Sequence, residues 1–322
     1  MKQLKENSSK FFIRLLVMVV AFVAVDQVAG MFLYYFFKHQ ASGEYAVANH
    51  VVYDLNEEVL VLGSSRASHH YNSSLIKDSL KLSCFNGGRD GEGLLYSTAI
   101  FELALQRHAP KVVILDVTSD VLSEKEDEKN RLSILLPYLK QSDVIGNMIE
   151  KKGRLELLKS HLQTYRYNGQ VVSIFQHYFL SSGNTVMGFN PLDSKMDVSS
   201  RSVNRNSSLK PYSDSISADN VDALNLFINE CKRQKIQLFV FVSPRYNDDT
   251  RLNSYLKMKN ICNSNKVIFH DFTNDEYFKN PEYYSDRAHL NSRGADLYTD
   301  TIVAFMKKRL APAVNVQYLS KN

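Results

Sequence analysis

Three residues near opposite ends of the chain could together perform nucleophilic chemistry. Ser65 follows the apolar run 59–62 and Gly63 in the stretch GSSR, while Asp286 and His289 stand three residues apart in SDRAHLN. A serine hydroxyl becomes an effective nucleophile when a base takes its proton, and a histidine oriented by a carboxylate is such a base. On one tight turn, Asp286 could accept the Nδ1 proton of His289 and leave the other ring nitrogen facing Ser65. We therefore expect a Ser-His-Asp triad.

Each of these signals has a structural alternative. A Gly-Ser-Ser turn after a strand often only caps the next helix, and His289 could be a polar loop residue beside a helix cap supplied by Asn291 or Ser292. His69 and His70 follow the serine turn closely. We expect these two at the surface of the next helix start rather than in the triad.

Alternating strand and helix patterns would position the triad. Short, β-branched apolar runs predict strands, and apolar positions at helical spacing predict helices. The predicted strands are 59–62, 82–85, 111–117, 237–242 and 267–271, and the predicted helices are 73–80, 94–107, 218–233, 251–263 and 292–310. This alternation favours an α/β fold with a parallel, doubly wound sheet, in which ligands bind beyond the carboxyl ends of the strands. Ser65 would lie at that edge.

A long insertion interrupts the alternation between the third and fourth strands, at about 122–218. It contains the charged run SEKEDEKN, helical patterns over 132–159 and a Ser/Asn-rich stretch at 197–217. Such a length exceeds a simple crossover, so we expect an inserted helical cap with a mobile loop. The segment TYRYNG offers Arg166 and Asn168 as candidate substrate-binding residues, although ordinary packing of the cap would explain its composition too.

Four segments in chain order resemble the conserved blocks of the SGNH (GDSL-like) hydrolase family. They are GSSR after the first strand, FNGGRDG after the second, VTSD after the third and DRAHLN before the last helix. The resemblance covers most of 59–310, and its last block is the specific one. It implies a flavodoxin-like, five-stranded parallel sheet with Ser65 as the nucleophile and Asp286 and His289 as its partners. It also implies oxyanion donors from the backbone of Ser65 and Gly88.

The third block departs from the family pattern. Ser119 stands where the family has an Asn that supplies a further oxyanion donor. Its single hydroxyl could replace that donor only partly, and losing one donor typically slows acyl transfer by about two to three orders of magnitude. We therefore expect weak hydrolysis. Arg66, beside the nucleophile, could bind an anionic substrate group or help to hold the oxyanion.

The stretch 15–37 is almost wholly apolar and long enough to cross a bilayer as a helix. Basic residues are concentrated in 1–14, so the positive-inside rule places this end in the cytoplasm and everything after the span in the periplasm or outside the cell. A cleaved signal peptide is the rival interpretation, but the stretch MFLYYFFKH offers no small-residue cleavage site. Asp26 inside the span either marks a partner helix or polar pathway, or is tolerated in protonated form or by local water.

The expected organisation is a cytoplasmic N-terminus (1–14), a transmembrane helix (15–37), a linker (38–57), an SGNH-like domain (58–310) and a C-terminal tail (311–322). The net charge is +5, without a basic block interleaved with aromatics, so nucleic-acid binding has no support. The sequence has no zinc-type spacing and no nucleotide fingerprint, so we expect neither metal nor cofactor. Cys84 is expected in the core, and a Cys231–Cys262 bond stays open.

Two functional classes follow. The single N-terminal span makes the chain similar to the membrane-anchored branch of the family, which includes the alginate O-acetyltransferases and the D-alanyl transfer protein of teichoic acid systems. That resemblance implies a serine-dependent O-acyltransferase in a bacterial inner membrane, which acylates or acetylates a cell-envelope polysaccharide together with a multispanning membrane acyltransferase. The alternatives are a carbohydrate or lipid esterase, and an inactive SGNH-fold binding or scaffold protein. The acyl group and the acceptor stay open.

Overall fold

The computed structural model describes residues 2–125, 127–180, 185–197, 215–246 and 253–319, with side chains described between 7 and 310. The chain divides into two compact units. The smaller unit comprises 1–46 and 132–182, and the larger comprises 47–131 and 183–322. The middle of the inserted segment therefore belongs to the same unit as the N-terminal helix.

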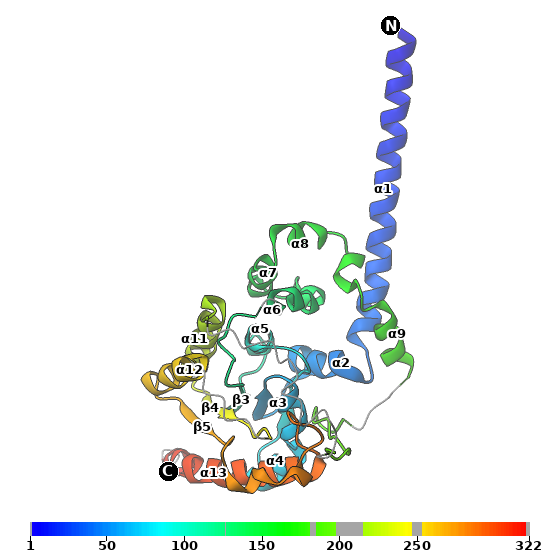
Figure 1. Ribbon diagram of the computed structural model, residues 1–322. Helices are drawn as coiled ribbons and strands as arrows, with labels where there is room; N and C mark the ends of the chain where they lie inside the picture. Colours follow the sequence, from blue (N-terminus) through cyan, green and yellow to red (C-terminus); the bar gives the residue numbers. More distant parts are fainter. Residues whose placement is uncertain (1, 126, 181–184, 198–214, 247–252, 320–322) are drawn as a thin grey trace. The chain divides into compact units, whose positions relative to one another are not determined.

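The larger unit is built on a five-stranded parallel sheet (Figure 1). Its strands are β1 (Val59–Leu62), β2 (Cys84–Asn86), β3 (Val112–Asp116), β4 (Gln237–Val242) and β5 (Ile268–Asp271). The spatial order is β2-β1-β3-β4-β5, the flavodoxin-like order, which confirms the predicted fold class. β1 and β4 have the predicted bounds, because central strands buried on both faces are continuous apolar runs.

Helices cover both faces of this sheet. In chain order the helical elements of the larger unit are η1 (His50–Asp54), α3 (Ser65–His70), α4 (Ser73–Leu80), α5 (Leu94–Leu105), α6 (Glu128–Arg131), α11 (Ala218–Arg233), α12 (Asn253–Ser264), η4 (Glu276–Lys279), η5 (Pro281–Tyr283) and α13 (Ser292–Leu319). α13 packs with α3 and α4 against one face, and α5 packs with α11 on the other, where Phe101 and Phe227 stack at 4.3 Å (Figure 1). α4 and α11 have the predicted bounds, whereas the short α3 was not predicted.

The elements that the structure describes in the smaller unit are all helices. The unit contains α1 (Lys2–Lys38), η2 (Leu132–Tyr138), α7 (Asp143–Glu150), α8 (Arg154–Lys159), η3 (Thr164–Tyr167) and α9 (Val171–Phe179), and α2 (Gly43–Asn49) begins in it. The helical character predicted for the insertion is thus confirmed, and its part within this unit, 132–182, is called the cap; most of the expected mobile loop lies outside the described residues. Within the part of the chain that the structure describes, Asn7–Lys38 is the one helix long and apolar enough to cross a membrane.

All three cysteines are buried and unpaired. Cys84 lies in β2, as expected, while Cys231 and Cys262 are both free thiols, so the bond left open between them is not formed. Burial raises the pKa of Cys231 and that of Cys262 to about 12. Thiols with such a raised pKa hold little thiolate near neutral pH and are unreactive.

The loop after β2 packs directly on the backbone of α3. A Cβ built on Gly88 would lie 2.4 Å from the backbone nitrogen of Ser68 and 2.7 Å from the carbonyl carbon of Ala67. Real side chains do not approach a backbone so closely, so glycine is required for this contact. The contact fixes the loop against the helix that begins with Ser65.

We predict that Gly88→Ala lowers the free energy of unfolding by about 1–3 kcal/mol, because the backbone of α3 must move to admit the methyl group. The matched control is Gly146→Ala in α7, where the nearest atom to a Cβ is Leu139 Cδ1 at 3.9 Å. In that helix interior, alanine should be neutral or stabilising by up to about 1 kcal/mol. Denaturant unfolding in detergent micelles, followed by circular dichroism, measures both. Equal stabilities for the two variants would contradict the close-packing role of Gly88.

Candidate active site

Ser65 is the first residue of α3 and directly follows the sharp turn that ends β1. Gly63 makes this turn with a φ of 145°, and a Cβ there would lie 2.6 Å from the carbonyl oxygen of Asp116. Only glycine lets the chain leave β1 so close to the end of β3. The first helical bond runs from Ser68 N–H to Ser64 O at 3.1 Å, so the backbone N–H of Ser65 has no partner within the helix.

The structure brings together the three residues that the sequence singled out for a triad. Ser65 Oγ lies 2.7 Å from His289 Nε2, although the two residues are 224 positions apart. On the other side of the ring, His289 Nδ1 lies 2.9 Å from Asp286 Oδ2 and 3.0 Å from Oδ1. A carboxylate only accepts, so Nδ1 carries the ring proton and Nε2 is left to accept from the Ser65 hydroxyl. In this tautomer His289 can act as a base toward Ser65.

The turn that carries His289 is held by its own backbone. Asp286 Oδ1 accepts hydrogen bonds from the N–H groups of Ala288 at 2.7 Å and His289 at 3.0 Å. Burial raises the pKa of Asp286, but the bonds from the His289 ring and from these N–H groups outweigh it and lower the pKa below its usual value. Asn291 Oδ1 accepts from Gly294 N–H at 3.0 Å and so caps the start of α13, as expected.

His70 is buried in the core, which corrects the expectation that it would lie at the surface. Its Nε2 accepts a hydrogen bond of 2.9 Å from the backbone N–H of Leu290, the residue after the triad histidine. Burial, followed by the nearby charge of Arg66, holds the pKa of His70 well below its usual range. A neutral His70 therefore ties α3 to the turn that carries the base.

His69 is also buried, again in contrast to the expected surface position. Its Nδ1 lies 2.6 Å from the carbonyl oxygen of Asn190, and its Nε2 lies 3.0 Å from Asp90 Oδ2. Both partners can only accept, so both ring nitrogens must donate and the ring is held as an imidazolium. Burial lowers the pKa of His69, but the bonds to Asp90 and Asn190 outweigh it and raise the pKa above its usual value. The His69 and His289 rings meet edge to face at 5.5 Å.

Arg66 is buried rather than directed at a ligand. Its Nη2 donates to Val117 O at 2.7 Å, its Nη1 donates to Ser243 O at 3.1 Å, and its Nε lies 3.7 Å from Asp116 Oδ1. It is absent from the residues that line the neighbouring pocket. This placement differs from the substrate contact expected from the sequence. Arg66 instead joins the start of α3 to the ends of β3 and β4.

The two expected oxyanion donors differ in whether their N–H groups already have a hydrogen-bond partner. Gly88 N–H donates to Asn86 Oδ1 at 2.9 Å, and the Asn86 amide donates to Ala67 O at 2.7 Å and Tyr71 O at 3.0 Å. The buried Asn86 side chain thus clamps the loop to α3 and engages the N–H of Gly88. The backbone N–H of Ser65, in the first turn of α3, is the expected donor that keeps no partner within its helix.

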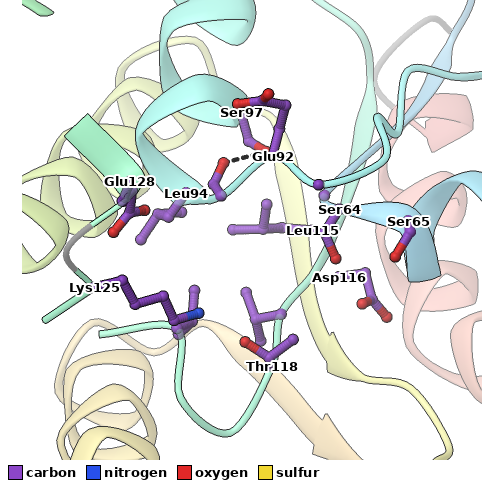
Figure 2. A pocket seen from close by; sticks show the side chains of 15 residues that line it. Ser64, Ser65, Glu92, Leu94, Ser97, Leu115, Asp116, Thr118, Lys125 and Glu128 are labelled. Carbon is purple, nitrogen blue, oxygen red and sulfur yellow. Dashed lines mark hydrogen bonds between the residues drawn. The ribbon is translucent and has the colours of Figure 1, made fainter. Parts of the chain in front are cut away.

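A pocket of about 240 Å³ adjoins Ser65 in the larger unit. Figure 2 shows Ser65 and Asp116 toward one end of the pocket and Lys125 and Glu128 at the other. Thr118 lines it after β3, whereas Ser119 does not. The hydroxyl that this loop offers to the pocket is therefore that of Thr118, one position before Ser119, the residue that the sequence indicated.

The remaining candidates, Arg166 and Asn168, belong to the smaller unit. Arg166 is buried and its Nε donates to Ser160 O at 2.9 Å, while Asn168 is exposed just after η3. Packing of the cap therefore accounts for Arg166. Among the described residues, no group of three or more His, Cys, Asp or Glu side chains is arranged to hold a metal ion.

Comparisons with known proteins give only distant similarity. No protein-family model matches the chain, and no curated protein matches it. One similar solved structure is a protein from Bacteroides fragilis provisionally named an acylhydrolase, with 13% identity, a TM-score of 0.40, and coverage of 80% of this chain and 90% of that one. Another is a protein of the G-D-S-L family from Desulfitobacterium hafniense, provisionally named lipolytic, with 8% identity, a TM-score of 0.36, and coverage of 77% and 98%. Any assignment must therefore rest on the geometry of the site.

We predict that the charged His69 makes the stability of the larger unit depend on pH. Because its pKa is raised in the folded state, its contribution is fully present below the unfolded value of about 6.5 and is lost as the pH rises through the folded value. Wild type should therefore lose more free energy of unfolding across this window than His69→Gln. The exposed His161→Gln is the control and should follow wild type. Parallel curves for wild type and His69→Gln would show that the ring is not held as an imidazolium.

Proposed function

We propose that this chain is a serine-dependent acyl-transfer enzyme of the SGNH hydrolase type. The observation that supports it most strongly is the 2.7 Å contact between Ser65 Oγ and His289 Nε2, with Asp286 on the far ring nitrogen. Nucleophilic catalysis requires a serine hydroxyl next to an unprotonated imidazole nitrogen, with a carboxylate on the other ring nitrogen to orient the ring. The pocket beside Ser65 offers space for an acyl donor.

The proposed reaction has two steps. Ser65 Oγ attacks the carbonyl carbon of an ester donor and gives its proton to His289 Nε2; the donor C–O bond then breaks, and His289 returns the proton to the leaving oxygen. In the second step an acceptor hydroxyl gives its proton to His289 and attacks the acyl-Ser65 carbonyl, and Ser65 Oγ leaves with the proton restored. Asp286 keeps the imidazole in the productive tautomer and stabilises the imidazolium in both steps.

The oxyanion that forms in each step needs positioned donors. The backbone N–H of Ser65 is one candidate, and Gly88 could join it only if its N–H turned away from Asn86. With Ser119 in place of the family Asn, the donor set is weak, and a weak set favours transfer to a well-placed acceptor over rapid hydrolysis. We therefore favour an O-acyltransferase over a free esterase.

The proposed setting is the bacterial cell envelope. The apolar helix Asn7–Lys38 would anchor the chain in the inner membrane, with the basic N-terminus in the cytoplasm and the catalytic unit on the other side. The acceptor would then be an envelope polysaccharide hydroxyl, and a multispanning membrane acyltransferase would supply the acyl group. An anchored esterase and an inactive binding protein are the alternatives that the following two experiments separate.

We predict that a fluorophosphonate labels Ser65 in the full-length chain in detergent micelles. Ser65→Ala should abolish labelling and acyl turnover, and His289→Ala and Asp286→Asn should each lower turnover by about four orders of magnitude. The turnover of the His289→Ala/Asp286→Asn double variant should be no lower than that of the slower single variant, because the two residues act as a unit. Ser74→Ala, on α4, is the control and should label normally. Absent labelling of a folded wild-type chain would leave the inactive binding protein.

We also predict that an oligosaccharide acceptor raises acyl turnover. With a small activated acetyl ester as donor, hydrolysis alone should be slow, and added acceptor should speed consumption of the donor and place the acetyl label on sugar hydroxyls. The same oligosaccharide with methylated hydroxyls is the control and should have no effect. Fast hydrolysis that is indifferent to either sugar would favour the anchored esterase.

A further inference from the structure

The polar residue in the apolar part of α1 has its partners within the same unit. Asp26 is 4% exposed, and its carboxylate accepts hydrogen bonds from Gln163 N–H at 2.7 Å, Thr164 N–H at 3.1 Å and the Thr164 hydroxyl at 2.6 Å. One turn later, a Cβ on Gly30 would lie 2.2 Å from Gln163 Cβ. Asp26 thus holds the start of η3 by hydrogen bonds, and Gly30 lets the same segment pack closely on α1.

This docking face continues along α1. Asp26, Gly30 and Phe37 are buried and share one stripe of the helix, while Met31 and Phe32 on the other sides are 72% and 62% exposed. Phe36, which is half-buried, packs against α9, with its ring 4.8 Å from that of Phe175. The cap therefore covers one side of the last third of α1 and leaves the others open.

The dimensions of a bilayer place this contact inside it. Only the eleven residues 15–25 separate Arg14 from Asp26, and at about 1.5 Å per residue they span roughly 17 Å. The hydrocarbon core is about 30 Å thick and needs about 20 residues. A span of that length includes Asp26 and Gly30 whether it starts after Arg14 or after Lys10. The cap residues docked on them must then lie at membrane depth.

The outer surface of the cap is apolar at the same level. Exposed apolar side chains on α8, α9 and the segments after them include Leu155, Leu158, Leu162, Val172, Phe179 and Leu180, and Val172 reaches 80% exposure. In Figure 1, α8 lies farther toward the amino-terminal end of α1 than α9 does. Exposed apolar side chains in such number are costly in water and favourable against acyl chains.

Charged and aromatic residues of the cap suit the boundary between lipid and water. Residues 132–182 hold six Lys or Arg and three Asp or Glu, a net charge of +3. Lys152 and Lys159 both pair with Glu156, at 3.2 and 3.1 Å, so these charges of the cap are neutralised within it. The Tyr35 and Tyr178 rings, 6.2 Å apart, are of the type that concentrates at membrane interfaces.

We propose that the cap is a membrane-embedded element: it sits in the outer part of the bilayer beside α1, with the exposed apolar side chains of α8 and α9 in contact with lipid acyl chains. Asp26 holds the cap at that depth. The carboxylate is satisfied there by the backbone of 163–164, which removes the cost of an unpaired polar group in hydrocarbon. The inference rests on α1 spanning a membrane, and it is independent of the chemistry at Ser65.

Nitroxide labels on the full-length chain in phosphatidylethanolamine–phosphatidylglycerol vesicles test the proposal. Single cysteines would replace Leu155, Leu158 and Val172, since the native thiols are all buried, and the exposed Lys77 on α4 of the larger unit would be the control. Collisions with oxygen, which concentrates in lipid, should exceed those with a water-soluble nickel complex at the three apolar positions and fall below them at Lys77. Water-dominated collisions at any of the three, or shielding from both reagents, as a covering protein would cause, would overturn the proposal.

Asp26→Leu supplies a second measurement. It keeps α1 apolar, and therefore inserted, but removes the acceptors for Gln163 and Thr164. The label at Leu158 should then move toward water, with a several-fold rise in nickel collisions. The adjacent Gln27→Leu also makes α1 more apolar at an exposed position. It removes only the long 3.5 Å contact from Gln27 Nε2 to Asp26 Oδ2 and keeps the acceptors for Gln163 and Thr164, so it should leave the label where it is. An unchanged label in Asp26→Leu would show that Asp26 does not position the cap. Ser65 labelling by fluorophosphonate reports the catalytic proposal separately.

Discussion

The candidate active site depends on a buried guanidinium. A buried positive charge is costly unless it is paired. Two nitrogens of Arg66 donate to the carbonyls of Val117 and Ser243, and the Asp116 carboxylate lies 3.7 Å from Nε, close enough for an ion pair but too far for a hydrogen bond. These partners lie at the ends of β3 and β4. Burial raises the pKa of Asp116 above its usual value, and the Arg66 charge and the Tyr71 hydroxyl, 2.6 Å away, offset only part of this rise. Because Arg66 cannot move without leaving a charge unpaired, its neighbour Ser65 is fixed at the edge of the sheet.

The next element of the site uses two adjacent histidines in opposite protonation states. His69 faces two acceptors and is held as a cation, whereas the ring nitrogen of His70 faces a backbone N–H and must be an acceptor. Each choice follows from the partner rather than from the residue type. One histidine joins α3 to the loop after β2 and the other joins it to the turn that carries His289. The short helix that begins with Ser65 is thereby anchored to both segments that complete the site.

The sequence predicted much of this arrangement, and the misses have physical causes. Buried strands such as β1 are contiguous apolar runs, and an Asp and a His three residues apart before a helix form a local motif. Both features could therefore be recognised from the sequence alone. Arg66, His69 and His70 were misplaced because their burial depends on partners far along the chain, up to 220 positions away for His70. Nothing in the local sequence distinguishes a buried, paired polar side chain from a solvated one.

Under the proposal that α1 spans a membrane, Asp26 and Arg66 obey the same rule in two different solvents. Each is a charged residue type in apolar surroundings, and each is satisfied mainly by backbone groups of a segment more than fifty positions away, Gln163 and Thr164 for the one and Val117 and Ser243 for the other. In a protein core the penalty for an unpaired group is severe, and in hydrocarbon no water exists to relieve it. A polar residue of this kind therefore specifies which segment must pack against it. By this reasoning Asp26 specifies where the cap packs on α1, as Arg66 specifies where α3 packs on the sheet.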